Sequence, residues 1–425
     1  MVDEGALDRR WWGAVLAVWA VGLTVRLVYT LAARPRVPGL SDATTYHLTA
    51  NLLASGHGLI RPYDFFIGHL VHPTAEFPPL FPMVLSAGSW FGATSVLSHR
   101  VLTSVLGSAT VIVVALLARR VAGPLIALIA AAIVALHPML LGSDAIAMSE
   151  TLDTLIVAAA LLLCIRAIAA PSPWRWVLVG AALGAAVLTR GENLLLVALV
   201  AGPLAVRTTG GRRRWKPAGI IAATAFVVML PWTVRNAITF KAFVPVADDS
   251  GGAISGSNCP PAYFGAQAGL WLYSCNTQLN VRGLDEAQAA ARYRHQGLAY
   301  AQAHLTSVPR VVAIRVLRTW GLYRAGQQAD YETLEGRIRG MQRAGQLLDW
   351  LLYLPAAVGA VVVLRRDRAV GWVLLAPVML ATMTAALTYG NERFRASTEP
   401  AVAILAVVGL TAVIRRARGS VAPAA

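Results

Sequence analysis

Long apolar segments recur from one end of the chain to the other and constrain its fold more than any other feature. Ten of them run at about residues 11–32, 98–118, 121–137, 148–168, 174–190, 193–209, 217–236, 346–364, 370–388 and 400–415. A helix needs about 20 apolar residues to cross the hydrocarbon core of a bilayer. Only 14% of the 425 residues are charged, against about 25% in soluble domains. We therefore expect an all-α integral membrane protein, a polytopic bundle of about 10–11 transmembrane helices with juxtamembrane helices on the outer face.

The positive charges gather in short clusters between the apolar segments. These clusters are Arg9-Arg10, Arg119-Arg120, Arg166 with Arg175, Arg212-Arg213-Arg214 with Lys216, Arg365-Arg366 with Arg368, and Arg415-Arg416 with Arg418. Threading the segments alternately through a membrane puts every cluster on one side, which the positive-inside rule identifies as the cytoplasm. The net charge of +16 therefore reports the topology of a multi-pass protein in the cytoplasmic membrane. No nucleic-acid-binding motif accompanies it, and we expect no nucleic-acid partner.

This topology divides the chain into parts. Residues 1–10 form a cytoplasmic N-terminus, 11–236 an N-terminal transmembrane module with an outer loop at 33–97, 237–345 an outer loop with surface helices, and 346–425 the C-terminal transmembrane helices and a cytoplasmic tail. The apolar segment 79–92 contains Pro79 and Pro82 and is too short to span, so we expect an interfacial or re-entrant helix at the outer surface. The helical spacing of 285–325 predicts helices on the membrane surface.

Two of the three cysteines lie in the second outer loop. If that loop is outside the cytoplasm, Cys259 and Cys275 can form a disulfide. It would close a short loop and stabilise the fold by about 3 kcal/mol. The alternative is two free thiols. Cys164 lies inside an apolar segment, where we expect it to be inert.

Ionisable side chains remain at the outer ends of several helices. They are Asp42, Glu76, Asp144, Glu150, Arg190, Glu192, Arg235, Lys241, Glu392, Arg393, Arg395 and Glu399. Charges at membrane depth are costly and usually functional, although any single one can be an ordinary interfacial charge or part of a local ion pair. Carboxylates and arginines together at this boundary suit a lipid phosphate that carries a polar group. Arginine binds phosphate oxygens bidentately, and a carboxylate can take the proton of a hydroxyl nucleophile.

A series of motifs resembles one known superfamily. The first outer loop reads SDATTYHLTANLLASGHGL (41–59) and HPTAEFPPLFPMVLS (72–86), and further segments read LHPMLLGSDAIAMSETLDTL (136–155), ALTRGENLLL (187–196), LPWTVRNAITFKAFVPV (230–246) and YGNERFRASTEP (389–400). The series resembles the GT-C superfamily of membrane glycosyltransferases. It is closest to the branch of the protein O-mannosyltransferases and lipid A aminoarabinose transferases, which is glycosyltransferase family 39-like. These enzymes share a first outer loop with an Asp, a nearby Tyr and a Pro-Pro segment.

The resemblance implies an inverting glycosyltransferase that moves a sugar from a polyprenyl-phosphate donor to an acceptor glycan, lipid or protein, within a membrane and on its extracytoplasmic face. It implies that Asp42 is the general base, that Glu76 assists, and that Arg393 and Arg395 hold the donor phosphate. Further candidates for substrate binding are Tyr46, Arg190, Arg235, Asp144 and Glu150. The physics agrees with such roles, because displacing a phosphate from a sugar needs a carboxylate near the nucleophile and cations near the leaving group.

The sequence departs from superfamily members that bind a divalent metal through paired acids. Asp42 has no second Asp two residues away, and Mg²⁺ or Mn²⁺ would want more oxygen donors than Asp144 and Glu150 supply. We therefore expect no required cofactor, with a divalent metal as the alternative. His69, His72 and Glu76 have a spacing that could bind zinc, but we expect local hydrogen bonds from these histidines instead.

Two other functions fit a charged pocket in a helical bundle. A transporter or flippase of lipid-linked sugars would share it, but such proteins usually contain internal repeats and broken helices, and neither is evident in the sequence. A non-catalytic paralogue that acts as a scaffold would keep the fold and lose the site. The presence of Asp42 in its motif argues against the scaffold.

Overall fold

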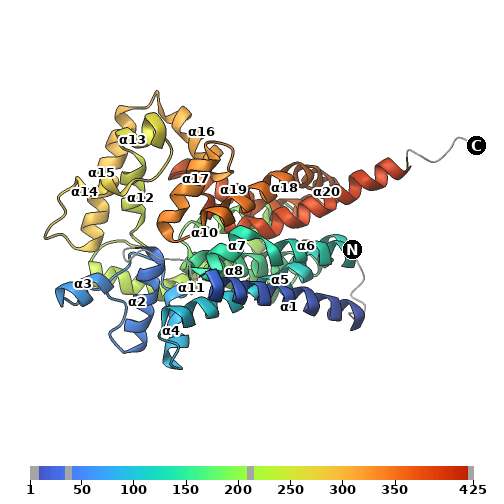
Figure 1. Ribbon diagram of the computed structural model, residues 1–425, viewed down its shortest axis with the longest axis horizontal. Coiled ribbons are helices and arrows are strands. Elements are labelled where there is room, and N and C mark those ends of the chain that lie inside the picture. The colour runs from blue at the N-terminus through green and yellow to red at the C-terminus, as the bar shows by residue number, and fades with distance from the viewer. Residues whose placement is uncertain (1–8, 34–40, 208–214, 420–425) are drawn as a thin grey trace, which may run out of the picture.

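The computed structural model describes residues 9–33, 41–207 and 215–419, and Figure 1 shows their arrangement. Within these ranges the chain is helical, and the only β pairing is an isolated bridge between Ile60 and Pro73. The helices of the bundle are α1 (Arg9–Ala33), α5 (Val96–Ala122), α6 (Pro124–Leu136), α7 (Pro138–Ala145), α8 (Ser149–Ala169), α9 (Pro173–Thr189), α10 (Asn193–Arg207), α11 (Lys216–Phe240), α18 (Arg339–Arg366), α19 (Arg368–Leu387) and α20 (Glu399–Gly419). The expected class, an all-α polytopic membrane protein, is confirmed, and every predicted span corresponds to a helix.

Seven of the described helices are long and apolar enough to cross a membrane, and the bent pair α6–α7 makes an eighth if it counts as one span. α9 and α10 are shorter apolar helices. The break between α6 and α7, which bends the chain by 49°, was not predicted. It arises because the residue before a proline is disfavoured in the α conformation, and His137, which precedes Pro138, has an extended backbone (φ −65°, ψ 117°).

Some of the positively charged clusters lie next to the ends of neighbouring helices. Trp11 at the start of α1 donates to the carbonyl of Pro124 at 3.3 Å, and Arg119 at the end of α5 lies 4.2 Å over the Trp11 ring. Arg175 at the start of α9 donates to the carbonyl of Arg166 at 3.2 Å. Arginines in the last turn of a helix also interact favourably with the negative end of the helix dipole. The cluster at 212–214 lies outside the described residues.

Small residues let two helix pairs approach closely in the bundle. Gly359 of α18 lies against the backbone of α20, and Gly409 of α20 lies against the backbone of α18, so that a Cβ at either position would overlap a carbonyl oxygen. Gly180 and Gly184 of α9, four residues apart, face the backbone of α11 in the same way. Small residues at this spacing are typical of helix contacts inside membranes.

The remaining helices gather at the other end of the bundle (Figure 1). They are α2 (Asp42–Ala54), α3 (Pro62–Gly68), α4 (Leu80–Trp90), α12 (Ser250–Ser257), α13 (Pro260–Tyr263), α14 (Tyr273–Thr277), α15 (Glu286–Ala303), α16 (Val308–Thr319) and α17 (Ala325–Glu332), with the 3₁₀ helices η2 (Gly265–Gln267), η3 (Thr333–Glu335) and η4 (Glu392–Thr398). α4 has 11 residues, which is about 16 Å of helix and too short to span. A disulfide joins Cys259 to Cys275 in this region.

Candidate active site

Two adjoining cavities lie where these end helices meet the bundle. The first, of about 390 Å³, is lined mainly by carboxylates and aromatic rings, and we call it the polar cavity. The second, of about 450 Å³, has mostly apolar walls that include Leu194, Leu195 and Leu387, and we call it the apolar cavity. Both are lined by Asp42, Phe77, Asp249, Ala253, Tyr389 and Arg393. The two cavities therefore meet at this set of residues.

Asp42 stands at the junction because it is the first residue of α2. Ser41 caps the helix by accepting a hydrogen bond from the amide of Thr44 at 3.3 Å, and a carboxylate in a first turn is favoured by the helix dipole. The side chain of Asp42 is 30% exposed, so solvent and ligands can reach it. Tyr46 follows one turn later, lines the apolar cavity and donates to the hydroxyl of Ser149 at 3.3 Å.

Arg393 joins three carboxylates that come from distant parts of the chain. Its Nη2 donates to Asp42 at 2.8 Å, its Nε to Glu150 at 2.5 Å, and its Nη1 to both oxygens of Glu335 at 2.7 and 2.9 Å. The planar guanidinium offers five donors in a fixed fork, which is why one side chain can serve all three. Asn391 begins η4 by accepting from the Arg393 amide at 2.9 Å, which fixes the backbone there.

Glu150 gathers guanidinium groups around a buried carboxylate. Besides Arg393, it faces Arg190 Nη1 at 3.0 Å and Arg337 Nη2 at 3.6 Å. Its side chain is 1% exposed, so it lies below the cavities and not in them. Arg190 also binds Glu192 at 2.7 Å and lines the apolar cavity with Arg393. Glu150 thus holds two arginines side by side at a cavity wall, an arrangement suited to phosphate.

The carboxyl groups of the polar cavity have raised pKa values, mainly because they are buried and also because they lie near one another. Burial raises the pKa of Glu76 to about 8, and the negative charges of Glu286 and Asp42 add to the effect. Burial likewise raises the pKa of Asp248 to about 8, again with a contribution from Glu286. Burial raises the pKa of Glu335 to about 7, although Arg393 opposes the shift. Perturbed groups of this kind often mark functional sites.

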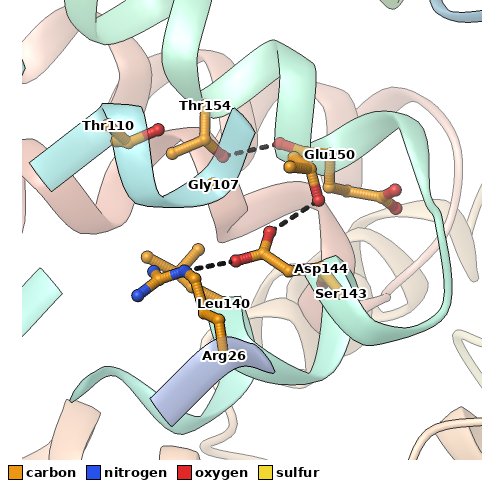
Figure 2. Close-up of a pocket in the computed structure, with 9 residues that line it drawn as sticks. Arg26, Gly107, Thr110, Leu140, Ser143, Asp144, Glu150 and Thr154 are labelled. Carbon is orange, nitrogen blue, oxygen red and sulfur yellow. Dashed lines mark hydrogen bonds and ion pairs between the residues drawn. The ribbon is translucent and has the colours of Figure 1, made fainter. Parts of the chain in front are cut away.

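Besides Glu150, three of the predicted site residues lie outside both cavities. Arg235 donates to the carbonyls of Thr74 at 2.8 Å and Leu59 at 3.1 Å, so it secures both ends of the segment 59–74. Asp144 pairs with Arg26 of α1 at 2.7 Å and accepts from Thr151 at 2.7 Å, as Figure 2 shows. This pair is buried beside a cavity of only about 10 Å³. The ion pair therefore joins α1 to α7.

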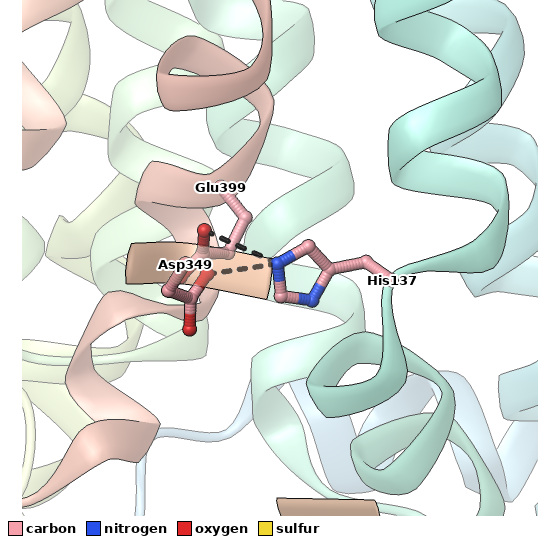
Figure 3. Close-up of side chains that lie close together, drawn as sticks. All are labelled: His137, Asp349 and Glu399. Atoms are coloured by element: carbon pink, nitrogen blue, oxygen red, sulfur yellow. Dashed lines mark hydrogen bonds and ion pairs between the residues drawn. The ribbon is translucent and has the colours of Figure 1, made fainter. Parts of the chain in front are cut away.

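Arg395 is the third of these residues, and its place follows from the geometry of η4. Residues two apart in a 3₁₀ helix point in directions about 120° apart, and here Arg393 faces the cavities while Arg395 faces the bundle. There Arg395 Nη2 binds Asp349 at 2.8 Å. Asp349 and Glu399 in turn lie 3.0 and 3.5 Å from His137 Nε2 (Figure 3).

Among the described residues, only His137, Asp349 and Glu399 bring three metal-type ligand atoms within 4.8 Å of one another. An imidazole and two carboxylates are ligands that zinc accepts. However, the Arg395 guanidinium already binds Asp349 at 2.8 Å and lies 3.6 Å from Glu399, so an ion there would be repelled by a fixed cation. The group fits an internal ion network better than a metal centre. Of the histidines that we expected to make local hydrogen bonds, His72 bonds Asp64 at 2.9 Å.

Several site residues were missed in the sequence analysis. Asp248 and Asp249 line the polar cavity directly after the segment 230–246, and a pair of adjacent acids in an outer loop could have indicated them. Glu286, Glu335 and Arg337 come from a region where no motif stands out, and only the folded chain brings them to Asp42 and Glu150.

A family model covers part of the chain. The model described as dolichyl-phosphate-mannose-protein mannosyltransferase matches residues 76–234. This stretch contains Glu76, Glu150 and Arg190 but neither Asp42 nor Arg393. A comparison with curated proteins by sequence gives no match.

Solved structures of an archaeal oligosaccharyltransferase share the fold over nearly the whole chain. The oligosaccharyltransferase of Archaeoglobus fulgidus tethered to an acceptor peptide is 15% identical, with a TM-score of 0.56 over 97% of this chain and 51% of its own. The same enzyme, AglB, with an inhibitory peptide and a dolichol-phosphate, is 16% identical with a TM-score of 0.55 over 99% and 53%. The chain thus spans about half the length of these oligosaccharyltransferases. ArnT from Cupriavidus metallidurans is 15% identical, with a TM-score of 0.44 over 92% of this chain and 77% of its own.

The helical bundle with a two-part cavity at one end defines a multi-pass membrane protein that carries a buried charged site. Its fold is that of the GT-C glycosyltransferases, and the family model that matches residues 76–234 is of the same kind. The resemblance that the sequence motifs indicated is therefore confirmed.

Proposed function

We propose that the protein is an inverting glycosyltransferase that moves a sugar from a polyprenyl-phosphate donor to an acceptor on the outer face of the cytoplasmic membrane. One observation carries the proposal. A carboxylate, Asp42, and an arginine, Arg393, lie at the junction between an apolar cavity and a polar one, and a second arginine, Arg190, lines the apolar cavity. The apolar cavity suits the lipid phosphate and the first isoprene units, and the polar cavity suits an acceptor.

In the proposed reaction Asp42 accepts the proton, and Arg190 and Arg393 stabilise the charge of the leaving phosphate. The acceptor hydroxyl loses its proton to Asp42 while its oxygen attacks the anomeric carbon, and the bond from that carbon to the phosphate oxygen breaks. The negative charge that develops on the leaving phosphate is stabilised by Arg393 and Arg190. Attack opposite the leaving group inverts the anomeric centre.

The contact between Asp42 and Arg393 gives the donor a role in preparing the base. A phosphate bound to Arg393 would compete with Asp42 for the Nη2 donor that now joins them at 2.8 Å. Release from that ion pair leaves the carboxylate free to face the acceptor hydroxyl. The donor would then bind before the acceptor can react.

The broken helix pair α6–α7 does not support the alternative of a lipid-linked sugar transporter. The break at His137 is filled by Asp349, Glu399 and Arg395, and none of these lines either cavity. Transporters place such breaks at the substrate.

The test is sugar transfer by the purified protein in lipid nanodiscs. A panel of radiolabelled polyprenyl-phosphate sugars is offered with an envelope extract as the acceptor source, with and without EDTA. We expect one sugar to be transferred by the wild type and not by Asp42→Asn, while Asp330→Asn, which removes an exposed carboxylate outside the cavities, stays active. Equal transfer by the wild type and Asp42→Asn would exclude the proposed base. The EDTA arm reports whether a divalent metal takes part.

A further inference from the structure

The polar cavity is rich in acidic groups, although the chain as a whole is basic. The protein has a net charge of +16, yet the cavity is lined by seven carboxylic acids and only two arginines, Arg61 and Arg393. The acids are Asp42, Glu76, Asp248, Asp249, Asp285, Glu286 and Glu335. An anionic ligand would be repelled from such a surface.

Some of these carboxylates already have partners. Asp42 and Glu335 bind Arg393, and Glu286 accepts from the Thr74 hydroxyl at 2.8 Å and the Ala75 amide at 2.7 Å. Asp285 caps α15 by accepting from the Gln288 amide at 2.8 Å.

The side chains of Glu76, Asp248 and Asp249 form no ion pair with a described residue, and the two aspartates are stabilised only by backbone amides, those of Asp248 itself and of Ser250. Asp248 is 4% exposed, and its Oδ2 is a buried acceptor without a donor. A buried carboxylate in this state is costly, and the raised pKa values of Asp248 and Glu76 report that cost. A ligand that brings hydrogen-bond donors and positive charge would remove it.

The arrangement favours an organic cation over a metal ion. The carboxylate oxygens of the polar cavity do not form a group of three within 4.8 Å of one another, as a preformed metal site would. Between them lie the rings of Trp271, Tyr273, Tyr293, Tyr331 and Tyr389. Separated carboxylates and aromatic rings together suit an ammonium group, which binds both through charge and through the faces of the rings.

The rings are held in place by their own polar atoms. Trp271 donates its Nε1 to the carbonyl of Gly252 at 2.9 Å, and Tyr331 donates to the carbonyl of Trp271 at 2.6 Å. The disulfide between Cys259 and Cys275 ties the same loop to α14. This wall of the cavity is therefore rigid before any ligand enters.

We infer that the polar cavity recognises an acceptor that carries a positively charged amine beside the hydroxyl that receives the sugar. The assignment of this cavity to the acceptor rests on the proposed function. The choice of a cation rests on Asp248, Glu76 and the surrounding rings.

The experiment measures binding without turnover. The full-length protein in phosphatidylcholine nanodiscs is titrated calorimetrically with 2-aminoethyl glucoside and with its neutral counterpart, 2-hydroxyethyl glucoside. We expect the amine to bind roughly tenfold more tightly, since one hydrogen-bonded charge contact contributes about 1.4 kcal/mol or more. Asp248→Asn and, independently, Glu76→Gln should reduce this preference several-fold, while Asp330→Asn, an exposed acid paired with Arg339, should keep it. Melting temperatures verify that each variant is folded.

Equal binding of the two probes by the wild type, or an unchanged preference in both folded cavity variants, would overturn the inference. The result is independent of the sugar-transfer assay. If the amine is preferred but no donor supports transfer, the cation site stands and the proposed reaction fails. If transfer occurs without any preference for the amine, the reaction stands and the inference fails.

Discussion

Replacement of Asp42 by Asn and of Glu150 by Gln should separate catalysis from structure within one ion network. Both changes remove a carboxylate that binds Arg393, at 2.8 Å for Asp42 and 2.5 Å for Glu150. Asp42 is 30% exposed and makes one ion pair, and the amide oxygen of Asn can still accept from Nη2. The free energy of unfolding should therefore fall by about 1 kcal/mol or less. Loss of a general base should lower the turnover number by about 10²–10⁴-fold.

Glu150→Gln should give the reverse pattern for stability. Glu150 is buried and accepts from Arg393 and from Arg190 at 3.0 Å, and hydrogen bonds to charged groups contribute about 1.5–3 kcal/mol each. Arg393 and Arg190 keep other carboxylates, Glu335 and Glu192, which limits the loss to about 3 kcal/mol. Chemical denaturation in detergent and the sugar-transfer assay measure the two quantities on the same samples. If Asp42→Asn is destabilised as much as Glu150→Gln, or keeps turnover within a few-fold of the wild type, the division of roles is wrong.

Further predictions concern the donor, the packing, the outer loop and pH. Arg190→Lys should raise the KM for the donor about tenfold or more, because lysine cannot bind a phosphate bidentately; an unchanged KM would place the phosphate elsewhere. Gly359→Leu should lower the free energy of unfolding by at least about 2 kcal/mol, and the melting temperature with it, because the side chain would overlap the backbone of α20. A melting temperature equal to that of the wild type would show that the helices are farther apart. Cys275→Ser should cost about 3 kcal/mol in the loop that the disulfide closes over 16 residues, and protease sensitivity between positions 259 and 275 reports it. Glu76 and Asp248 have pKa values raised to about 8, so the native state keeps protons that the unfolded chain releases, and stability should fall as pH rises from about 4 to about 8. Across this pH range the melting temperature should change less for Asp248→Asn than for the wild type.

The spans could be predicted because each depends on a local property. An apolar run of sufficient length has few alternatives to a helix in a membrane, and arginines at the ends of α5 and α18 are visible as adjacent letters in the chain. The motif around Asp42 could also be recognised, since Ser41 and Asp42 form a local helix start.

The site itself depends on contacts that no local pattern contains. Arg393 binds a carboxylate 351 residues earlier in the chain, and the sequence cannot say which of two arginines in RFR faces that carboxylate. In the folded chain the orientation of η4 turns Arg393, and not Arg395, toward this carboxylate. In the same way, the sequence shows Arg26 and Asp144 as separate charges in apolar surroundings, and only the packing of α1 against α7 makes them a pair. The break at His137 had a local signal in Pro138, which was not used.

The three carboxylates around Arg393 have a consequence for how the protein is made. Asp42, Glu150 and Glu335 precede Arg393 in the chain, and synthesis and membrane insertion proceed from the N-terminus. Two of the arginines that neutralise them, Arg190 and Arg337, emerge earlier, but the one cation that contacts all three is among the last side chains to arrive. The junction between the two cavities therefore closes only when the segment before α20 is in place, so a chain that stops short of residue 393 would insert most of its helices and still lack the site.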